Sequence, residues 1–117
     1  MGDRIASTRM DLDSIPWQET NYDGVAVHFY ASAPETRRVL ALIRMEPGCG
    51  YPRHKHRGDE EVLVLRGGYE DELGTYGAGQ LVHYAPGTEH GPRATGEPGG
   101  EPCVLLALAH EGVKLLS

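Results

Sequence analysis

The chain has 117 residues, with 17 acidic and 11 basic side chains and a formal net charge of −6. This length predicts one domain, residues 1–117, with a single hydrophobic core. The acidic balance argues against nucleic-acid or anionic-membrane binding, because neutralising phosphates requires a basic surface. The polar N-terminus has no secretion-signal pattern, and no apolar run is long enough to span a bilayer, so we expect a cytoplasmic protein.

In chain order, residues 1–20 are expected to form an N-terminal arm, and short runs rich in Val, Leu, Ile and Tyr follow. These runs have the length and composition of β-strands. Sixteen glycines and eight prolines are spread through the chain, and many of them lie in the predicted turns between the runs. The predicted strands are Val25–Ala31, Arg38–Glu46, Glu61–Arg66, Gln80–Ala85 and Cys103–His110.

No long segment has the 3.6-residue apolar period of an amphipathic helix. The Gly- and Glu-rich tract Ala94–Pro102 is expected to be an exposed loop between two strands. Cys49 and Cys103 are widely spaced and form no repeated pattern, so we expect two reduced thiols. Short strands joined by Gly/Pro turns predict an all-β, antiparallel sandwich or barrel.

Two histidines lie one residue apart at His54 and His56. In a strand, residues i and i+2 point to the same face, so both imidazoles should point together while Lys55 points away. Neutral imidazole is the commonest protein ligand for a divalent metal ion. A pair of this kind is also common on solvated strands, so it predicts a metal site only in combination with other ligands.

Paired glutamates follow the histidines, at the start of an aliphatic strand. Alternation places Glu60 on one face and Glu61 on the other, so one carboxylate can face the histidines. A carboxylate facing the interior is costly unless it is paired or bound to a metal ion. The alternative is that both glutamates lie at an exposed strand entrance. A fourth candidate ligand, His90, comes shortly after the Pro86-Gly87 turn.

The spacing of these residues resembles the cupin family. The segment Gly48-x5-His54-x-His56-x3-Glu60-x6-Gly67 agrees with the first cupin motif, G(X)5HXH(X)3,4E(X)6G, at every marked position. The resemblance implies an antiparallel double-stranded β-helix, that is, a jelly-roll barrel.

The second cupin motif, G(X)5PXG(X)2H(X)3N, is matched in part. Gly79, Gly87 and His90 are in register, whereas Ala85 occupies the proline position and Ala94 the asparagine position. The asparagine is not a metal ligand in this motif, so its replacement leaves the ligand set intact.

The stretch from the histidines to Pro-Gly-x-x-His resembles the ChrR-type group of cupins, which includes the C-terminal domain of oxidant-responsive anti-sigma factors. This resemblance implies that one divalent transition metal ion is bound by His54, His56, Glu60 and His90. Three imidazoles and a carboxylate suit zinc or iron, with manganese or nickel as alternatives.

Two functions follow from the resemblance. The first is a metal-dependent oxidoreductase, dioxygenase-like, that acts on a small carbonyl or phenolic compound, with Glu60 as a general base if it leaves the metal. The second is a non-catalytic zinc-binding sensor or small-ligand-binding module.

Further residues are assigned lesser roles. Tyr84 is a candidate catalytic residue, expected to face the metal and hydrogen-bond to a ligand, or else to pack in the barrel. Arg53 and Arg57 flank the histidines and are expected either to meet an anionic substrate or to be solvated. By family resemblance, the arm is expected to cover a sheet edge in a homodimer.

Overall fold

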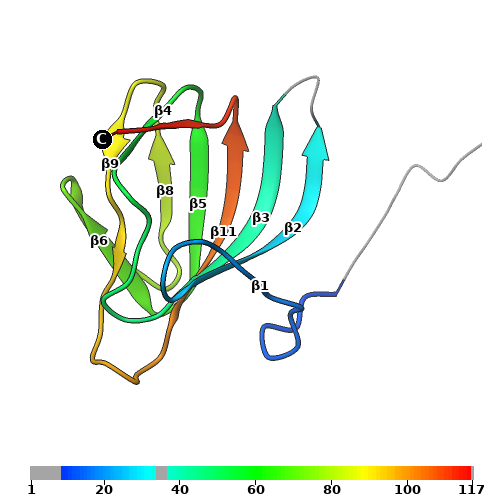
Figure 1. Ribbon diagram of the computed structural model, residues 1–117, viewed down its shortest axis with the longest axis vertical. Helices are drawn as coiled ribbons and strands as arrows, with labels where there is room; N and C mark the ends of the chain where they lie inside the picture. The colour runs from blue at the N-terminus through cyan, green and yellow to red at the C-terminus, as the bar shows by residue number, and fades with distance from the viewer. Residues whose placement is uncertain (1–8, 34–36, 117) are drawn as a thin grey trace, which may run out of the picture.

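The computed structural model describes residues 9–33 and 37–116, and these residues form strands, turns and loops without a helix. Twelve strands follow one another along the chain (Figure 1). Their bounds are β1 Gln18–Glu19, β2 Val25–Ala33, β3 Arg38–Met45, β4 His54–His56, β5 Glu60–Arg66, β6 Gly68–Asp71, β7 Gly74–Gly77, β8 Leu81–Tyr84, β9 Glu89–His90, β10 Arg93–Ala94, β11 Cys103–His110 and β12 Val113–Leu115.

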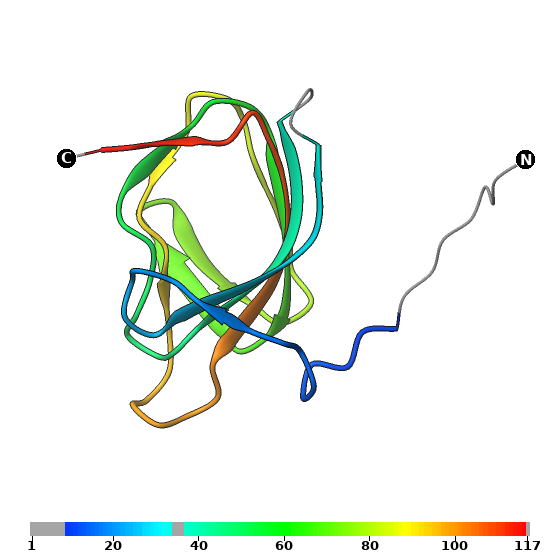
Figure 2. The same ribbon diagram turned by 45° about the vertical axis from the view of Figure 1, so that its right-hand side comes forward.

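The strands form an antiparallel jelly roll, which confirms the predicted fold class. A six-stranded sheet has the order β1-β2-β3-β11-β5-β8. Two three-stranded sheets, β10-β6-β7 and β12-β4-β9, lie opposite the large sheet, as the turned view shows (Figure 2). The core fills the space between these layers and contains Val25, Met45, Val64, Tyr69 and Leu105, each at most 4% exposed.

All five predicted strands are present, with ends shifted by two residues or fewer. The other seven strands were not predicted, and each has only two to four residues. Period-2 alternation cannot be recognised in so few positions. The turn-forming residues around these short segments therefore mask their strand character in the sequence. Residues 95–102 are largely exposed, as predicted for the loop, but Ala94 belongs to β10 and is 2% exposed.

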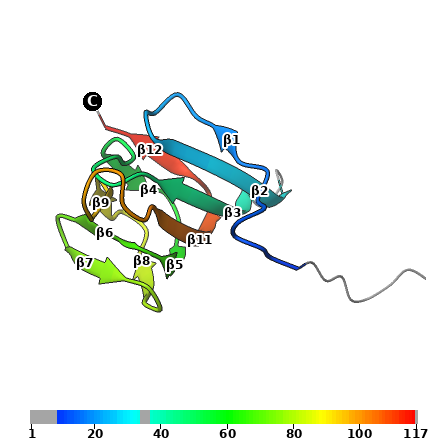
Figure 3. The same cartoon turned by 90° about the horizontal axis from the view of Figure 1, so that it is seen from below.

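The described part of the N-terminal arm packs against its own chain. β1 lies at the edge of the large sheet and pairs with β2 (Figure 3). The Arg44 guanidinium lies 5.1 Å from the centre of the Trp17 ring, and Arg66 forms a 2.9 Å ion pair with Asp13. Residues 1–8 of the predicted arm lie outside the described residues. The described part of the chain has no helix long and apolar enough to cross a membrane.

Candidate metal centre

Three buried histidines lie close together on the inward-facing side of the three-stranded sheet β12-β4-β9. β4 points His54 and His56 inward and Lys55 outward, and His90 of β9 pairs in register with His54. The three residues are 7%, 1% and 2% exposed, respectively. One ring nitrogen from each lies within 4.8 Å of the others, an arrangement that could hold a metal ion.

The turn before β9 explains how His90 reaches the other two histidines. Gly87 has a φ of +90°, which a residue without Cβ adopts at little cost. The Gly87 amide donates to the His56 carbonyl at 2.8 Å, and the His56 amide donates to the Thr88 carbonyl at 2.8 Å. The backbone therefore ties the Pro-Gly turn directly to the strand that carries the first two histidines.

Hydrogen bonds on the far side of two rings orient their metal-binding nitrogens. Nδ1 of His54 donates to the Pro52 carbonyl at 2.9 Å, and Nδ1 of His90 donates to the Asp71 carboxylate at 2.9 Å. Each donation leaves an Nε2 lone pair free for coordination. The geometry fits a metal, because His56 Nε2 lies 2.9 Å from His90 Nε2. Two imidazoles bound at about 2.1 Å to one ion are separated by roughly 3 Å when the angle between them is near 90°.

Burial also keeps the rings of His54 and His56 in the neutral form that binds metal ions. Desolvation lowers the pKa of His56 to about 4, and the neighbouring His54 and His90 lower it further. Desolvation likewise lowers the pKa of His54, although the hydrogen bond to Pro52 partly opposes the shift. Neutral imidazoles at physiological pH are ready to donate lone pairs to a cation.

Glu60 is placed beside the cluster at the start of β5. Its Oε1 atom lies 3.4 Å from His56 Nε2, and its side chain is 14% exposed. Burial raises the Glu60 pKa to about 7, with a further contribution from the charge of Glu61. Glu60 lines the interior, whereas Glu61 lies on the opposite face of the strand. The structure thus brings three of the sequence-predicted ligand residues, the histidines, into one group, and places Glu60 next to this group through its contact with His56.

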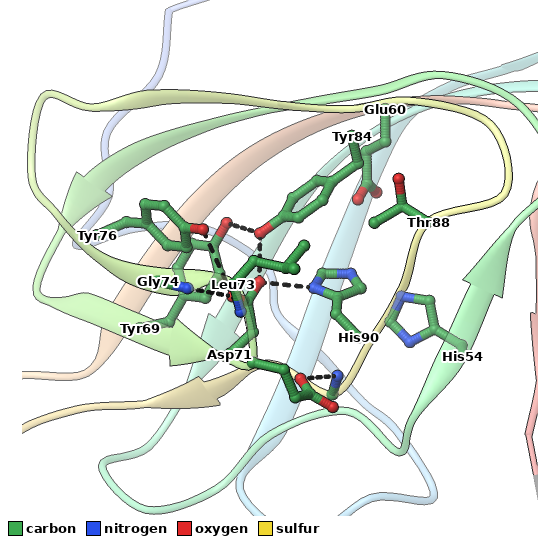
Figure 4. Close-up of polar contacts among 12 residues, drawn as sticks. His54, Glu60, Tyr69, Asp71, Leu73, Gly74, Tyr76, Tyr84, Thr88 and His90 are labelled. Atoms are coloured by element: carbon green, nitrogen blue, oxygen red, sulfur yellow. Dashed lines mark hydrogen bonds and ion pairs between the residues drawn. The ribbon is translucent and has the colours of Figure 1, made fainter.

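The Tyr84 ring touches two of the histidines, but its hydroxyl points to Asp71. The ring stacks on His56 with centroids 5.4 Å apart and lies 4.2 Å from the His90 ring. The hydroxyl donates to Asp71 Oδ2 at 2.7 Å and accepts from the Tyr69 hydroxyl at 2.6 Å (Figure 4). Burial, together with these hydrogen bonds, raises the Tyr84 pKa, so the phenol stays protonated. Tyr84 thus contacts His56 and His90 with its ring, and its hydroxyl is linked to His90 through Asp71.

Asp71 is the residue of this site that the sequence did not reveal. Its side chain is fully buried at the end of β6 and contacts His90, Tyr84 and the amides of Leu73 and Gly74 (Figure 4). Burial opposes ionisation, but the hydrogen bonds from Tyr84, His90 and Leu73 outweigh it and lower the Asp71 pKa. The only available sequence signal was the Asp-x-x-Gly turn of residues 71–74, which predicts a hairpin and says nothing of His90.

A cavity of about 400 Å³ opens beside the histidines, within the size range of small-molecule sites. Its walls are mainly aliphatic and aromatic side chains of both layers, and His54, Glu60 and His90 form part of its surface. The arginines beside the motif do not line it. Arg53 instead forms ion pairs with Glu72 at 3.3 Å and Glu89 at 3.4 Å at the surface.

Comparison with known proteins gives the same family as the sequence motifs. The family model described as ChrR Cupin-like domain matches residues 6–107. The anti-sigma-E factor ChrR of Cereibacter sphaeroides is 36% identical over 69 residues, which cover 59% of this chain and 31% of that protein.

Two solved structures have the same fold. A chain in the crystal structure of Rhodobacter sphaeroides SigE in complex with the anti-sigma ChrR aligns with a TM-score of 0.73 and 30% identity, covering 85% of this chain and 51% of that chain. The acetylacetone dioxygenase of Acinetobacter johnsonii aligns with a TM-score of 0.81 and 16% identity, covering 100% and 83%. The present chain therefore spans about a third to a half of the anti-sigma factor.

Proposed function

This chain belongs to the ChrR cupin-like domain family, and from this premise and the buried histidine cluster we propose that it binds one divalent transition metal ion. The proposed ligands are His54, His56, Glu60 and His90. Their set of three imidazoles and one carboxylate suits zinc or iron, with manganese or nickel as alternatives.

We further propose that the protein is a metal-dependent, dioxygenase-like oxidoreductase that acts on a small carbonyl or phenolic compound. The observation that carries this proposal is the apolar cavity that opens onto His54, Glu60 and His90. A purely structural metal site needs no such cavity, whereas a catalytic site must admit a substrate. The acetylacetone dioxygenase supports only the common fold, because its identity to this chain is 16%.

The residues divide the chemical work between them. Bound iron would supply Lewis acidity and redox chemistry toward dioxygen, whereas bound zinc would supply Lewis acidity alone. Glu60, once released from the metal, would accept a proton from an acidic carbon or a phenolic hydroxyl of the substrate, because burial and the charge of Glu61 raise its pKa to about 7 in the metal-free site. Asp71 and Tyr84 hold His90 and His56 in place. We therefore assign Tyr84 a positioning role in place of the catalytic role that its sequence position suggested.

A second candidate is a non-catalytic zinc-binding sensor or ligand-binding module. It is supported by the likeness to the anti-sigma factor ChrR, at 36% identity over 69 residues. Four protein ligands can saturate tetrahedral zinc and leave no open position.

Homodimer formation is a separate proposal. Light scattering tests it, because a dimer has twice the mass of one chain.

The metal site is tested by elemental analysis of the purified protein and two variants. We expect about one metal ion per chain in the wild type and a loss of at least tenfold in His90→Ala. His83→Ala is the matched control, because His83 is 53% exposed and pairs with Asp59 outside the cluster. A His90→Ala protein with full metal content would remove His90 from the ligand set.

Oxygen uptake separates the two functions. The protein is loaded with Fe(II) or with zinc and mixed with acetylacetone or phenol in an oxygen electrode. Sustained uptake by the iron form alone supports the oxidoreductase. Tightly held zinc, without uptake by the iron form, supports the sensor.

A further inference from the structure

We propose that the cavity selects an uncharged, largely apolar molecule with one hydrogen-bond-accepting oxygen, and that the Tyr51 hydroxyl donates to this oxygen. The proposal rests on the proposed function and deepens it, because it names the class of ligand for the same site. Four features of the cavity carry it, namely its walls, its charges, the Tyr51 hydroxyl and its mouth.

The walls favour an apolar ligand body. β3 contributes Val39, Ala41 and Ile43 from one inward face, and Val62 and Leu105 line the cavity from β5 and β11. These side chains offer no hydrogen-bond donor or acceptor. A polar group placed against them would lose its water without gaining a partner, which costs free energy.

The charges of the cavity disfavour an ionic ligand. No Lys or Arg is among the described residues that line it, and Arg53 is already paired with Glu72 and Glu89 outside. In the metal-free cavity an anionic group would therefore have no cation as a partner, and an ionised Glu60 would repel it. With the metal ion bound, a cationic ligand would be repelled by that ion.

Tyr51 supplies a donor that the fold itself does not use. It lines the cavity beside His54, with ring centroids 6.5 Å apart, and its ring lies edge-on to Tyr22 at 5.5 Å. Its hydroxyl has no hydrogen bond to any other described residue, whereas the hydroxyls of Tyr69 and Tyr84 bond to each other. Burial raises the Tyr51 pKa to about 12, so the phenol is protonated at neutral pH and can donate.

The mouth of the cavity is apolar as well. Phe29, Val113 and Leu115 line the cavity and are 54%, 41% and 56% exposed, respectively. Leu115 pairs in register with His54, so β12 places its apolar face directly beside the metal site. Exposed apolar side chains around an opening favour the entry of apolar molecules.

The test compares probes of equal shape. The ¹⁵N-labelled full chain is titrated, after chelator treatment, with acetophenone, α-methylstyrene and benzoate, and dissociation constants are obtained from amide shifts. The first two probes differ only by O in place of CH₂, and benzoate adds the charge. We expect acetophenone to bind about three- to tenfold more tightly than α-methylstyrene, as for one added neutral hydrogen bond, and benzoate to bind most weakly.

Tyr51→Phe should abolish the preference for the oxygen-containing probe without weakening α-methylstyrene binding. Tyr30→Phe is the matched control, because Tyr30 contacts His28 and does not line the cavity. Equal binding of acetophenone and α-methylstyrene by the wild type would overturn the proposal, as would tight binding of benzoate. A preference that persists in Tyr51→Phe would also overturn it.

Metal content, measured on the same preparations before chelator treatment, separates this inference from the proposed function. A wild type that purifies without metal but prefers acetophenone would refute the metal site and leave the inference standing. A wild type that holds metal but shows no preference would refute the inference alone.

Discussion

At the scale of single residues, Asp71 connects the metal site to the rest of the fold. One carboxylate oxygen, Oδ1, accepts from the amides of Leu73 and Gly74 and thereby forms the β6–β7 turn. The other, Oδ2, accepts from His90 and Tyr84. A single buried carboxylate thus shapes the hairpin and fixes the orientation of the His90 ring, a proposed metal ligand.

We predict that Asp71→Asn lowers metal affinity by about 10- to 100-fold, the usual effect of losing the partner behind a ligating histidine. An amide removes the negative charge that holds the Nδ1 proton of His90, and so weakens the preference for a free Nε2 lone pair. Competition with a chromophoric chelator measures the affinity. Asp59→Asn is the control, since Asp59 pairs with the exposed His83. Equal affinities in both variants would contradict the role of Asp71.

Single residues also mark the limit of the sequence analysis. His54, His56, Glu60 and His90 were recognisable because they share a motif with fixed spacing. Asp71 and Tyr51 belong to no such pattern. Their importance comes from side chains of other strands that surround them, and spacing along the chain does not encode these neighbours.

At the scale of elements, the site depends on very short strands held by close backbone contacts. Gly50 forms an isolated bridge with Arg93, just before the segment that leads into β4. A Cβ at Gly50 would overlap the Pro92 carbonyl oxygen, which is backbone and cannot rotate away. The glycine therefore allows the segments that lead to His54 and away from His90 to approach each other.

We predict that Gly50→Ala reduces the free energy of unfolding by about 1–3 kcal/mol, as expected for overpacking against a fixed group. Urea denaturation measures the change. Gly77→Ala is the matched control, because the nearest atom to its added Cβ is a side-chain oxygen at 3.8 Å. If both variants unfold at the same urea concentration, the close approach at Gly50 has no energetic importance.

The long strands were predictable and the short ones were not. β3 and β11 each have eight residues, enough for a recognisable apolar run. β4, β9 and β10 have three, two and two residues, and their assignment depends on hydrogen bonds to segments far away in sequence. The strands β6 and β7 have four residues each, and their glycines hide the strand character of Tyr69 and Tyr76 in the local composition.

At the scale of the whole molecule, two layers from distant parts of the chain enclose the cavity and the site. The large sheet supplies Glu60 through β5, and the opposing layer supplies the three histidines through β4 and β9. A metal ion bound to all four would therefore cross-link the two layers. Its binding free energy would then be available only to the folded state.

We predict that chelation lowers the melting temperature of the wild-type protein. At a free metal concentration about 100 times the dissociation constant, binding adds about 2.7 kcal/mol to the free energy of unfolding. This corresponds to roughly 10 °C for a domain of this size. Calorimetry with and without chelator measures the shift, and His90→Ala serves as the control. A shift of equal size in His90→Ala would show that the effect does not arise at this site.

The sequence by itself determined the family, the all-β class, the long strands and the four proposed metal ligands. These depend on the local alternation of apolar and polar residues and on the spacing of motif residues, and both can be read directly from the sequence. Only the tertiary structure decided that Asp71 supports His90, that the Tyr84 hydroxyl points to Asp71, and that Tyr51 lines an apolar cavity with a hydroxyl that bonds to no other described residue. Such features arise when segments far apart in sequence pack together, and packing between sheets leaves no periodic trace in either segment.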